Sequence, residues 1–524
     1  MHIGIDVGGT NTDAVLVDGD RVLAGVKCST TEDVTGGIRQ ALHDLGAAAG
    51  FDPAAVSAVM IGTTHFVNAL VEGARLAPVA AVRLGLPATA SLPPMVDWPE
   101  RLVTAVAGRS YLCHGGNEFD GRIISDLRPD ELRRAAADMA AHGVLSVAIT
   151  SVFSPVSAEF EKQAAQILAA ELPGVPMSLS HEIGRIGLLE RENATIVNAA
   201  LRLLADGVVR GLSDAVREAG IPGDLYLSQN DGTLMDLEQA RRHPVATFAS
   251  GPTNSMRGAA FLSGIGDCAV VDVGGTTSDI GILAGGFPRE ATTEVTVAGI
   301  RTNFRMPDVL SLGIGGGSLV RAAGGAPGPG VSVGPDSVGY ALPTRARVFG
   351  GDVLTASDIA VAAGRADMGD RSLVAGMDRS LVAAALDRIA ADVGAVVDRM
   401  RLSPAELTVV AVGGGSCLLP DALAGIGKVT RPEHHDVANA IGAAIAQIGG
   451  EVDRVFAIAP GTRDSVLDGA KQEAVDRAVA AGAQRDSVRI VDVDEVPMAY
   501  LPGNATRVRV KAVGDLVLDG GRSE

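Results

Sequence analysis

Aromatic side chains are scarce in this sequence, and basic side chains are outnumbered by acidic ones. Phe, Trp and Tyr make up 3% of the 524 residues, which disfavours a surface that stacks on bases or sugars. There are 62 acidic and 44 basic residues, so the formal charge is −18. Nucleic-acid backbones and anionic membranes are bound through clustered Lys and Arg. We therefore expect neither a nucleic acid nor a membrane as a partner.

Cysteine is also rare, and long apolar runs are missing. The four cysteines are far apart, with neither the paired spacing of a zinc site nor the density of a disulfide scaffold. The longest uncharged segment, 139–158, contains too many polar side chains for a membrane-spanning helix. Met1 leads directly into an apolar strand, without the charged start and cleavage site of a signal peptide. We expect a cytoplasmic protein.

Glycine, by contrast, is abundant: there are 66 glycines, about 13% of the chain against a usual ~7%. They gather in tight clusters between apolar segments, and two of these clusters repeat each other. Residues 5–13 read IDVGGTNTD and residues 271–279 read VDVGGTTSD, with six of nine positions identical at an offset of 266. One Gly-Gly turn carries little information, but two copies in similar surroundings indicate a shared structural role.

Apolar extended segments flank both copies. Segments 1–7 and 14–17 enclose the first, and segments 269–273 and 280–284 enclose the second. This pattern predicts that each copy forms the tip of a β-hairpin. In Walker loops and dinucleotide fingerprints the glycines lead into a helix instead. Neither copy contains the Gly-Lys-Ser/Thr of a Walker loop, so both of those phosphate-binding motifs are excluded.

Hairpin tips of this composition are suited to bind phosphate. Paired glycines let backbone N–H groups approach phosphate oxygens, and neighbouring hydroxyl and amide side chains add donors. An aspartate at the end of the preceding strand can hold hydrated Mg²⁺. The alternative is a pair of ordinary Gly-Gly hairpins. We expect Asp6 and Asp272 to be catalytic residues that organise the metal, and the phosphates to be bound by Gly8, Gly9, Thr10, Asn11, Thr12, Gly274, Gly275, Thr276 and Thr277.

A third glycine cluster follows the apolar strand 409–412 and precedes a helix expected near Pro420. It consists of Gly413, Gly414 and Gly415. In this order, the three clusters resemble the two phosphate motifs and the adenosine motif of the actin, Hsp70 and sugar-kinase superfamily of ATP-binding proteins. The resemblance implies ATP and Mg²⁺ as cofactors and a two-lobed, actin-like (ribonuclease H-like) α/β fold.

The superfamily resemblance also divides the chain. It implies a first lobe over 1–201, a second lobe over 202–453 and a small added α+β domain over 454–524. Helical stretches of small residues at 193–204 and 437–448 resemble the two helices that cross between the lobes, the second returning to the first lobe over 437–450. The alternative for both stretches is a tightly packed core helix.

Further segments narrow the resemblance to one family. They occur in order along the chain, at 61–69, 115–122, 152–156, 180–183, 189–194, 250–252 and 313–318. From Met1 to about Gly450, the sequence is similar to the hydantoinase A/5-oxoprolinase family. This similarity implies ATP-dependent opening of a small cyclic amide such as a hydantoin, 5-oxoproline or another lactam. It also implies a second, B-type subunit as a partner, because the large second half of full-length oxoprolinases is not in this sequence. Homo-oligomerisation is left open.

Amide resonance makes the carbonyl a poor electrophile, and transfer of the γ-phosphoryl group to the carbonyl oxygen would activate it toward water. Phosphoryl transfer needs positioning and charge neutralisation, which two phosphate hairpins and Mg²⁺ can supply. Three alternatives remain. They are an ATP-binding subunit of a ketone carboxylase of the acetone carboxylase type, a small-molecule kinase, and a nonenzymatic protein like Hsp70 or actin.

The substrate side of the site is less defined. We expect His65 directly after the end of a strand, with Asn68 one turn further on, and both are candidates for contact with the substrate. A histidine there can orient a carbonyl or transfer a proton near neutral pH, whereas a packed or capping histidine is the alternative. Glu118 and Asp120 form a possible carboxylate pair, and the His-His-Asp run at 434–436 is read as a helix start rather than a metal site.

Overall fold

The computed structural model describes residues 1–9, 11–29, 34–291, 294–322, 330–498 and 504–517. Within these ranges the chain forms an α/β fold with mixed sheets. One sheet has nine strands, a second has seven and a third has four, and two further strand pairs complete the set. No helix in the described ranges is long and apolar enough to cross a membrane.

The nine-stranded sheet contains the first hairpin and the first and last strands of the described chain. Its strand order is β23-β24-β22-β10-β9-β4-β1-β2-β3. The central strands β1 and β4 are almost entirely buried, as their continuous apolar sequences predict for strands covered on both faces. The largest apolar core lies beside this sheet, against α1 (Val34–Ala49) and α7 (Leu188–Glu218). The strands are β1 His2–Val7, β2 Asn11–Asp18, β3 Arg21–Ser29, β4 Ala58–Thr63, β9 Asp224–Ser228, β10 Thr233–Met235, β22 Gln447–Ala457, β23 Arg489–Pro497 and β24 Ala505–Gly514.

The seven-stranded sheet repeats the arrangement around the second hairpin. Its order is β13-β12-β11-β19-β21-β20, with β16 paired to β12. In both sheets a hairpin is flanked by a parallel strand, β4 beside β1 and β19 beside β11. The strands are β11 Cys268–Val273, β12 Ser278–Ala284, β13 Phe287–Pro288, β16 Val309–Leu312, β19 Val409–Val412, β20 Ala422–Leu423 and β21 Gly427–Thr430; the small pairs are β14 Val295–Val297 with β15 Ile300–Thr302, and β17 Ser318–Ala322 with β18 Val331–Ser337.

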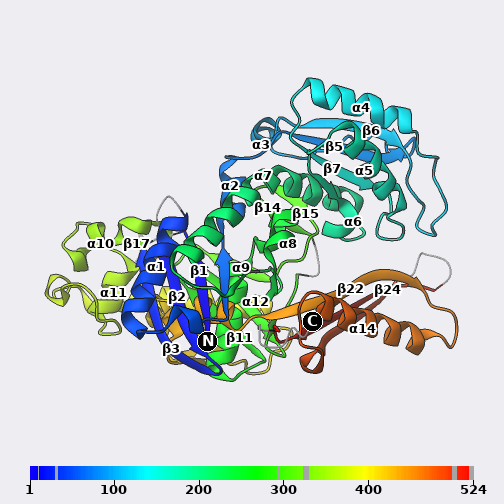
Figure 1. Cartoon of the computed structure of the whole chain (residues 1–524). Coiled ribbons are helices and arrows are strands. Elements are labelled where there is room, and N and C mark those ends of the chain that lie inside the picture. Colours follow the sequence, from blue (N-terminus) through cyan, green and yellow to red (C-terminus); the bar gives the residue numbers. More distant parts are fainter. Residues whose placement is uncertain (10, 30–33, 292–293, 323–329, 499–503, 518–524) are drawn as a thin grey trace.

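A four-stranded parallel sheet is inserted between α2 and α7. Figure 1 shows it with its helices as a separate lobe at the upper right, in cyan. Its order is β6-β5-β7-β8, and a helix connects each strand to the next. The elements are β5 Val79–Leu86, α3 Glu100–Ala105, β6 Arg109–His114, α4 Pro129–Ala141, β7 Ser146–Ser151, α5 Glu159–Glu171, β8 Met177–Leu179 and α6 Ser180–Ile183.

Two helices connect the two hairpin sheets, and only one of them lies where the sequence predicted. α9 (Ser250–Ser263) leads from the nine-stranded sheet to the seven-stranded sheet, and α13 (Ala438–Ala444) leads back. α9 and α13 pack directly against each other. The prediction of a crossing helix at 193–204 was wrong: these residues belong to α7, whose small side chains pack in the core against β7 and α1.

The strand pairing differs from the predicted domain limits at two places. β9 and β10, within the range 202–453 assigned to the second lobe, pair in the nine-stranded sheet. The 454–524 segment continues that same sheet, because β24 pairs with β22 over ten residues. α13 also ends at Ala444, so residues 447–450 of the predicted crossing helix are strand instead. The domain limits themselves stay a prediction.

The C-terminal strands and α14 (Arg463–Ala480) form the orange and red arm at the lower right of Figure 1. α14 packs on β22 and β24, and its buried alanines make this contact close. The remaining helices are α2 His65–Glu72, α8 Leu237–Arg242, α10 Leu342–Arg345, α11 Ala356–Ala362 and α12 Arg379–Met400.

Candidate functional site

The two sequence repeats form β-hairpins with the same register, which confirms that part of the prediction. Asp6 is opposite Asp13 in the first hairpin, and Asp272 is opposite Asp279 in the second. Each turn is closed by the first glycine of its Gly-Gly pair: Gly8 N donates to Asn11 O at 3.0 Å, and Gly274 N donates to Thr277 O at 2.9 Å. The internal repeat is therefore structural as well as sequential. Thr10 lies outside the described residues.

Each strand-end aspartate is packed against a glycine that lies in the parallel neighbour strand or directly after it. Asp6 pairs in register with Gly62 of β4, and a Cβ at Gly62 would lie 2.4 Å from Asp6 Oδ1. At the second hairpin, a Cβ at Gly413 would lie 2.3 Å from Asp272 Oδ1. Gly413 has a φ of +82°, which also favours glycine. Both carboxylates thus occupy equivalent, tightly enclosed positions.

Consecutive residues of α9 contact the two aspartates. Asn254 Nδ2 donates to Asp6 Oδ1 at 3.5 Å, and Ser255 Oγ donates to Asp272 Oδ2 at 2.5 Å. α9 packs against β4 of the first sheet and against β11 and β12 of the second, so it can reach both hairpins. One helix therefore ties the first hairpin to the second.

The first hairpin has a further partner from α13. Asn439 Nδ2 donates to Asp6 Oδ2 at 3.0 Å and to Asp13 Oδ2 at 2.8 Å. Lys27 of β3 makes an ion pair with Asp13. From the sequence we expected no functional role for Asp13 or Asn439. The repeat could have pointed to Asp13, because this residue is identical in both copies.

Burial shapes the protonation of both strand-end carboxyls. Burial raises the pKa of Asp6 to about 6, and the nearby charge of Asp13 adds to this effect. Burial likewise raises the pKa of Asp272 to about 6, although the hydrogen bond from Ser255 opposes the shift. The charge of Asp272 also raises the pKa of Asp6, so the carboxylates of the two hairpins lie within electrostatic reach of each other.

These residues fit a hydrated cation held mainly by phosphate. In the described part of the chain, no three His, Cys, Asp or Glu side chains are arranged to hold a metal by themselves. Mg²⁺ usually keeps several waters and takes one or two carboxylates together with phosphate oxygens. Two buried carboxylates that are costly to ionise would gain from such a cation. Beside them, the buried Asn254 Oδ1 has no hydrogen-bond partner and could accept from a metal-bound water.

Two glycine loops pack against the second hairpin. Gly415 N donates to Val273 O at 2.8 Å, so the predicted adenosine motif does adjoin the hairpin. The other loop lies in segment 313–318, which resembles the family and for which the sequence predicted no role in this site. Gly316 N donates to Gly274 O at 2.9 Å, and Gly317 N donates to Gly275 O at 2.7 Å. The helix expected near Pro420 is absent, because the described chain forms a short 3₁₀ turn at Ser416–Leu418 and then the β20–β21 hairpin.

His65 is the first residue of α2, directly after β4, as the sequence predicted. The preceding Thr64 donates from its backbone N and its Oγ1 to Val7 O, each at 3.4 Å, which holds this loop against the first hairpin. His65 Nε2 lies 3.0 Å from Arg75 Nη1, and Asn68 is exposed with its Nδ2 3.4 Å from Thr64 Oγ1. A substrate role for His65 and Asn68 stays a prediction.

The remaining candidates have structural contacts. Asp120 accepts hydrogen bonds from Arg122 in an exposed turn. His435 begins the short turn before α13, as predicted, and its backbone O accepts from Gly413 N at 2.8 Å. His435 therefore helps to fix the third glycine cluster.

Comparison with known proteins agrees with this architecture. Residues 2–172 match the hydantoinase/oxoprolinase N-terminal region, and residues 191–372 match the hydantoinase/oxoprolinase domain. The chain is 28% identical to the caprolactamase subunit alpha of Pseudomonas jessenii over 366 residues, which are 63% of this chain and 51% of that one. It is 26% identical to the acetophenone carboxylase gamma subunit of Aromatoleum aromaticum over 374 residues, 64% of this chain and 49% of that one. The matched region thus spans about half the length of these relatives.

Solved structures show the same fold. The crystal structure of the ATP-dependent caprolactamase from Pseudomonas jessenii aligns with a TM-score of 0.79 at 20% identity, covering 98% of this chain and 87% of the other. Nucleotide-free acetone carboxylase aligns with a TM-score of 0.67 at 17% identity, covering 99% and 88%. Together with the two matched regions, these similarities show that the chain belongs to the hydantoinase/oxoprolinase family.

Proposed function

We propose that the chain binds Mg²⁺–ATP between its two hairpins and uses it to open a cyclic amide. The observation that carries this proposal is the pair of matching hairpins, each with a buried aspartate, connected through consecutive residues of α9. Gly9 and Gly275 would present backbone N–H groups to the phosphates, as an anion-binding turn does, because the N–H groups of Gly8 and Gly274 already close their turns. The paired hairpins support our inference of an actin-like ATPase fold.

ATP would supply a phosphoryl group to the amide carbonyl oxygen, which removes amide resonance and makes the carbon open to attack by water. The protein's own contribution would be positioning and charge balance. Asp6 and Asp272, held by Asn254 and Ser255, would organise the metal and its waters. ATP-dependent caprolactamase, a relative of the same fold, supports the choice of a cyclic amide as substrate class.

A second subunit is part of the proposal. The caprolactamase and acetophenone carboxylase relatives are both named as subunits, and the present chain matches about half of each. We infer that this chain is the ATP-binding subunit and that a B-type subunit completes the enzyme.

Carboxylation of a ketone is the second candidate function. It is favoured by the similarity to the acetophenone carboxylase gamma subunit and to the acetone carboxylase beta subunit of Xanthobacter autotrophicus, the latter 25% identical over 276 residues. In the first reaction ATP would phosphorylate the amide carbonyl oxygen, and in the second the oxygen of the ketone or of bicarbonate, so the hairpin site alone does not separate them. The two functions are distinguished by the molecule that accepts the phosphoryl group and by the products.

The test is phosphate release from ATP in the presence of hydantoin, 5-oxoproline, larger lactams, or a ketone with bicarbonate, followed by mass spectrometry of the products. A ring-opened product supports the amidohydrolase, a carboxylated product the second candidate, and a stable phosphorylated product a kinase. In the same assay, Asp272→Asn should lower turnover by ~10²-fold or more, the usual scale for losing a preorganised electrostatic group. The exposed Asp421→Asn is the matched control. Near-normal turnover in a folded Asp272→Asn protein would remove Asp272 from the mechanism.

A further inference from the structure

The inserted four-stranded sheet has the topology in which ligands bind at one edge. Its order, β6-β5-β7-β8, means that the chain moves outward from β5 in one direction to β6 and in the other direction to β7 and β8. In open parallel sheets, ligands bind outside the carboxyl ends of the strands, where the order reverses. Here that position is the edge formed by the ends of β5 and β7.

Three family segments that the hairpin site does not use meet at this edge. Segment 115–122 follows β6, segment 152–156 follows β7, and segment 180–183 follows β8. Contacts join them: Asn117 N donates to Val152 O at 3.1 Å, and Ser154 Oγ lies 3.0 Å from Ser180 Oγ. The edge is thus a single built structure made from segments far apart in the sequence.

A histidine at this edge is fixed by a buried carboxylate. His181 Nδ1 lies 2.6 Å from Glu161 Oε2, and Glu161 also accepts hydrogen bonds from His181 N, Ser180 Oγ and Ser151 N. Burial by itself would raise the pKa of Glu161, but the hydrogen bonds and charge of His181 outweigh it and lower that pKa. The Glu161 carboxylate therefore occupies the Nδ1 side of the His181 ring, and Nε2 is the ring nitrogen left for a ligand.

His181 lines a cavity of about 760 Å³, a volume typical of small-molecule sites. The cavity lies between the carboxyl edge of the inserted sheet and β22 at the start of the C-terminal arm, and its wall includes Asn230, Glu451 and Asp453. Another wall residue, His243, is kept neutral because burial lowers its pKa to about 4, and its buried Nδ1 has no hydrogen-bond partner. Two imidazoles thus face one polar cavity.

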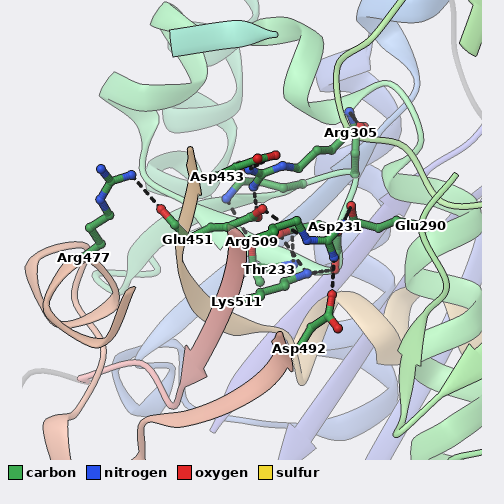
Figure 2. Close-up of polar contacts among 12 residues, drawn as sticks. Asp231, Thr233, Glu290, Arg305, Glu451, Asp453, Arg477, Asp492, Arg509 and Lys511 are labelled. Carbon is green, nitrogen blue, oxygen red and sulfur yellow. Dashed lines mark hydrogen bonds and ion pairs between the residues drawn. The ribbon is translucent and has the colours of Figure 1, made fainter. Parts of the chain in front are cut away.

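The charged side chains around Glu451 and Asp453 neutralise one another. Figure 2 shows Arg305 next to Glu451 and Asp453, Arg509 between Glu290 and Asp492, and Lys511 on Asp231. Burial alone would raise the pKa of Asp231, but Lys511 outweighs it and lowers that pKa to about 2. Because these charges are paired with one another, this side of the wall offers polar contacts to an uncharged ligand rather than an unpaired charge to an ion.

The cavity is connected to the hairpin site through α9. Asn230 O accepts from Thr253 Oγ1 at 2.8 Å, and Asn230 Oδ1 accepts from Ala249 N at 2.7 Å. Thr253 immediately precedes Asn254, the partner of Asp6. A ligand that shifts Asn230 would therefore act on the helix that holds both aspartates.

We propose that this cavity is the organic-substrate site, that it takes a small uncharged cyclic amide, and that His181 Nε2 accepts a hydrogen bond from the amide N–H. The proposal rests on the proposed function for its substrate class. It assigns to Glu161 the role of a positioning residue, because Glu161 reaches the substrate only through His181.

The test compares ε-caprolactam with N-methylcaprolactam, which lacks the N–H, in calorimetric binding without nucleotide. The wild-type protein should bind ε-caprolactam ~10-fold more tightly, because the methylated ligand leaves His181 Nε2 unpaired. His181→Ala should remove this difference between the two ligands, a result that a merely structural effect on the cavity would not produce. Gln163→Ala, an exposed change on the same helix as Glu161, is the matched control and should keep the difference.

Two results would overturn the proposal. One is an unchanged preference for ε-caprolactam in folded His181→Ala. If His181→Ala does not fold, Val156→Trp is measured instead, at an exposed position on the cavity wall. This change should weaken lactam binding at least ~10-fold. Unchanged lactam binding in Val156→Trp is the second result that would overturn the proposal. The phosphate-release assay separates this proposal from the proposed function. If lactam stimulates ATP hydrolysis but His181→Ala still prefers ε-caprolactam over N-methylcaprolactam, only the cavity proposal is overturned. If lactam binding depends on His181 but lactam does not stimulate ATP hydrolysis, only the proposed function is overturned.

Discussion

The crossing of α9 and α13 leaves no room for a side chain at Gly442, and this makes Gly442→Ala a sharp perturbation. A Cβ at Gly442 would lie 1.8 Å from Asn254 O, and on the opposite helix a Cβ at Gly258 would lie 1.9 Å from Ala438 O. Both obstacles are backbone atoms, so a rotamer change cannot relieve them. The helices would have to move apart by more than an ångström.

The expected cost is a balance of two terms. Overpacking of a tight core usually costs ~1–3 kcal/mol. Replacing a helical glycine by alanine returns ~0.5–1 kcal/mol of backbone entropy. We therefore expect Gly442→Ala to lower the free energy of unfolding by about 0–2.5 kcal/mol, the difference between these two ranges. Gly394→Ala in α12, where a Cβ would meet nothing within 4 Å, should instead raise it by ~0.5–1 kcal/mol.

The same change should affect turnover, because Asn254 is a partner of Asp6. If closure of the two hairpins depends on this crossing, Gly442→Ala should lower substrate-stimulated phosphate release more than it lowers ATP affinity. Unfolding is measured in urea, ATP affinity by calorimetry and phosphate release with and without substrate, all on one preparation. The reasoning is refuted if Gly442→Ala is as stable as Gly394→Ala, or if it abolishes ATP binding while leaving the fold intact.

Three further predictions follow from the buried charges and the relatives. Because burial raises the pKa of Asp6 to about 6, the folded state holds that proton more tightly than the unfolded state, and stability is lost as pH rises from about 4 to about 6. In urea titrations of the nucleotide-free protein, the stability of Asp6→Asn relative to wild type should therefore rise by about 3 kcal/mol between pH 4 and pH 7–8; a constant difference at all pH values contradicts the shift. In the core, Arg83 Nε donates to Glu192 Oε1 at 2.7 Å. Glu192→Ala should lower the free energy of unfolding by ~3–5 kcal/mol in the same titrations, because it leaves the buried Arg83 without its counter-ion. A loss under ~1 kcal/mol would count against this. Purified alone, the chain should bind ATP but complete ring opening only with a B-type subunit added, so full activity of the single chain would refute the partner.

Local elements could be read from the sequence because their determinants are close together along the chain. Both hairpins have their two strands and their turn within about twenty residues, with an apolar strand on each side of a Gly-Gly pair. Asp6 and Asp272 were therefore found from sequence, and so was the position of His65 at the start of α2. The same local reasoning misplaced a crossing helix at 193–204, because small residues serve a core helix and a crossing helix equally well.

The sequence by itself determined the repeat, the hairpins, the strand-end aspartates and the family. Only the tertiary structure decided what surrounds those aspartates: Asn254 is 248 residues from Asp6 and Asn439 is 433 residues from it, and no local pattern encodes such pairs. Only the tertiary structure also brought Glu161 to His181 and extended the first sheet with the C-terminal strands. The physical reason is that a turn is specified by neighbouring residues, whereas helix crossings and sheet edges are set by how buried surfaces from distant segments pack together.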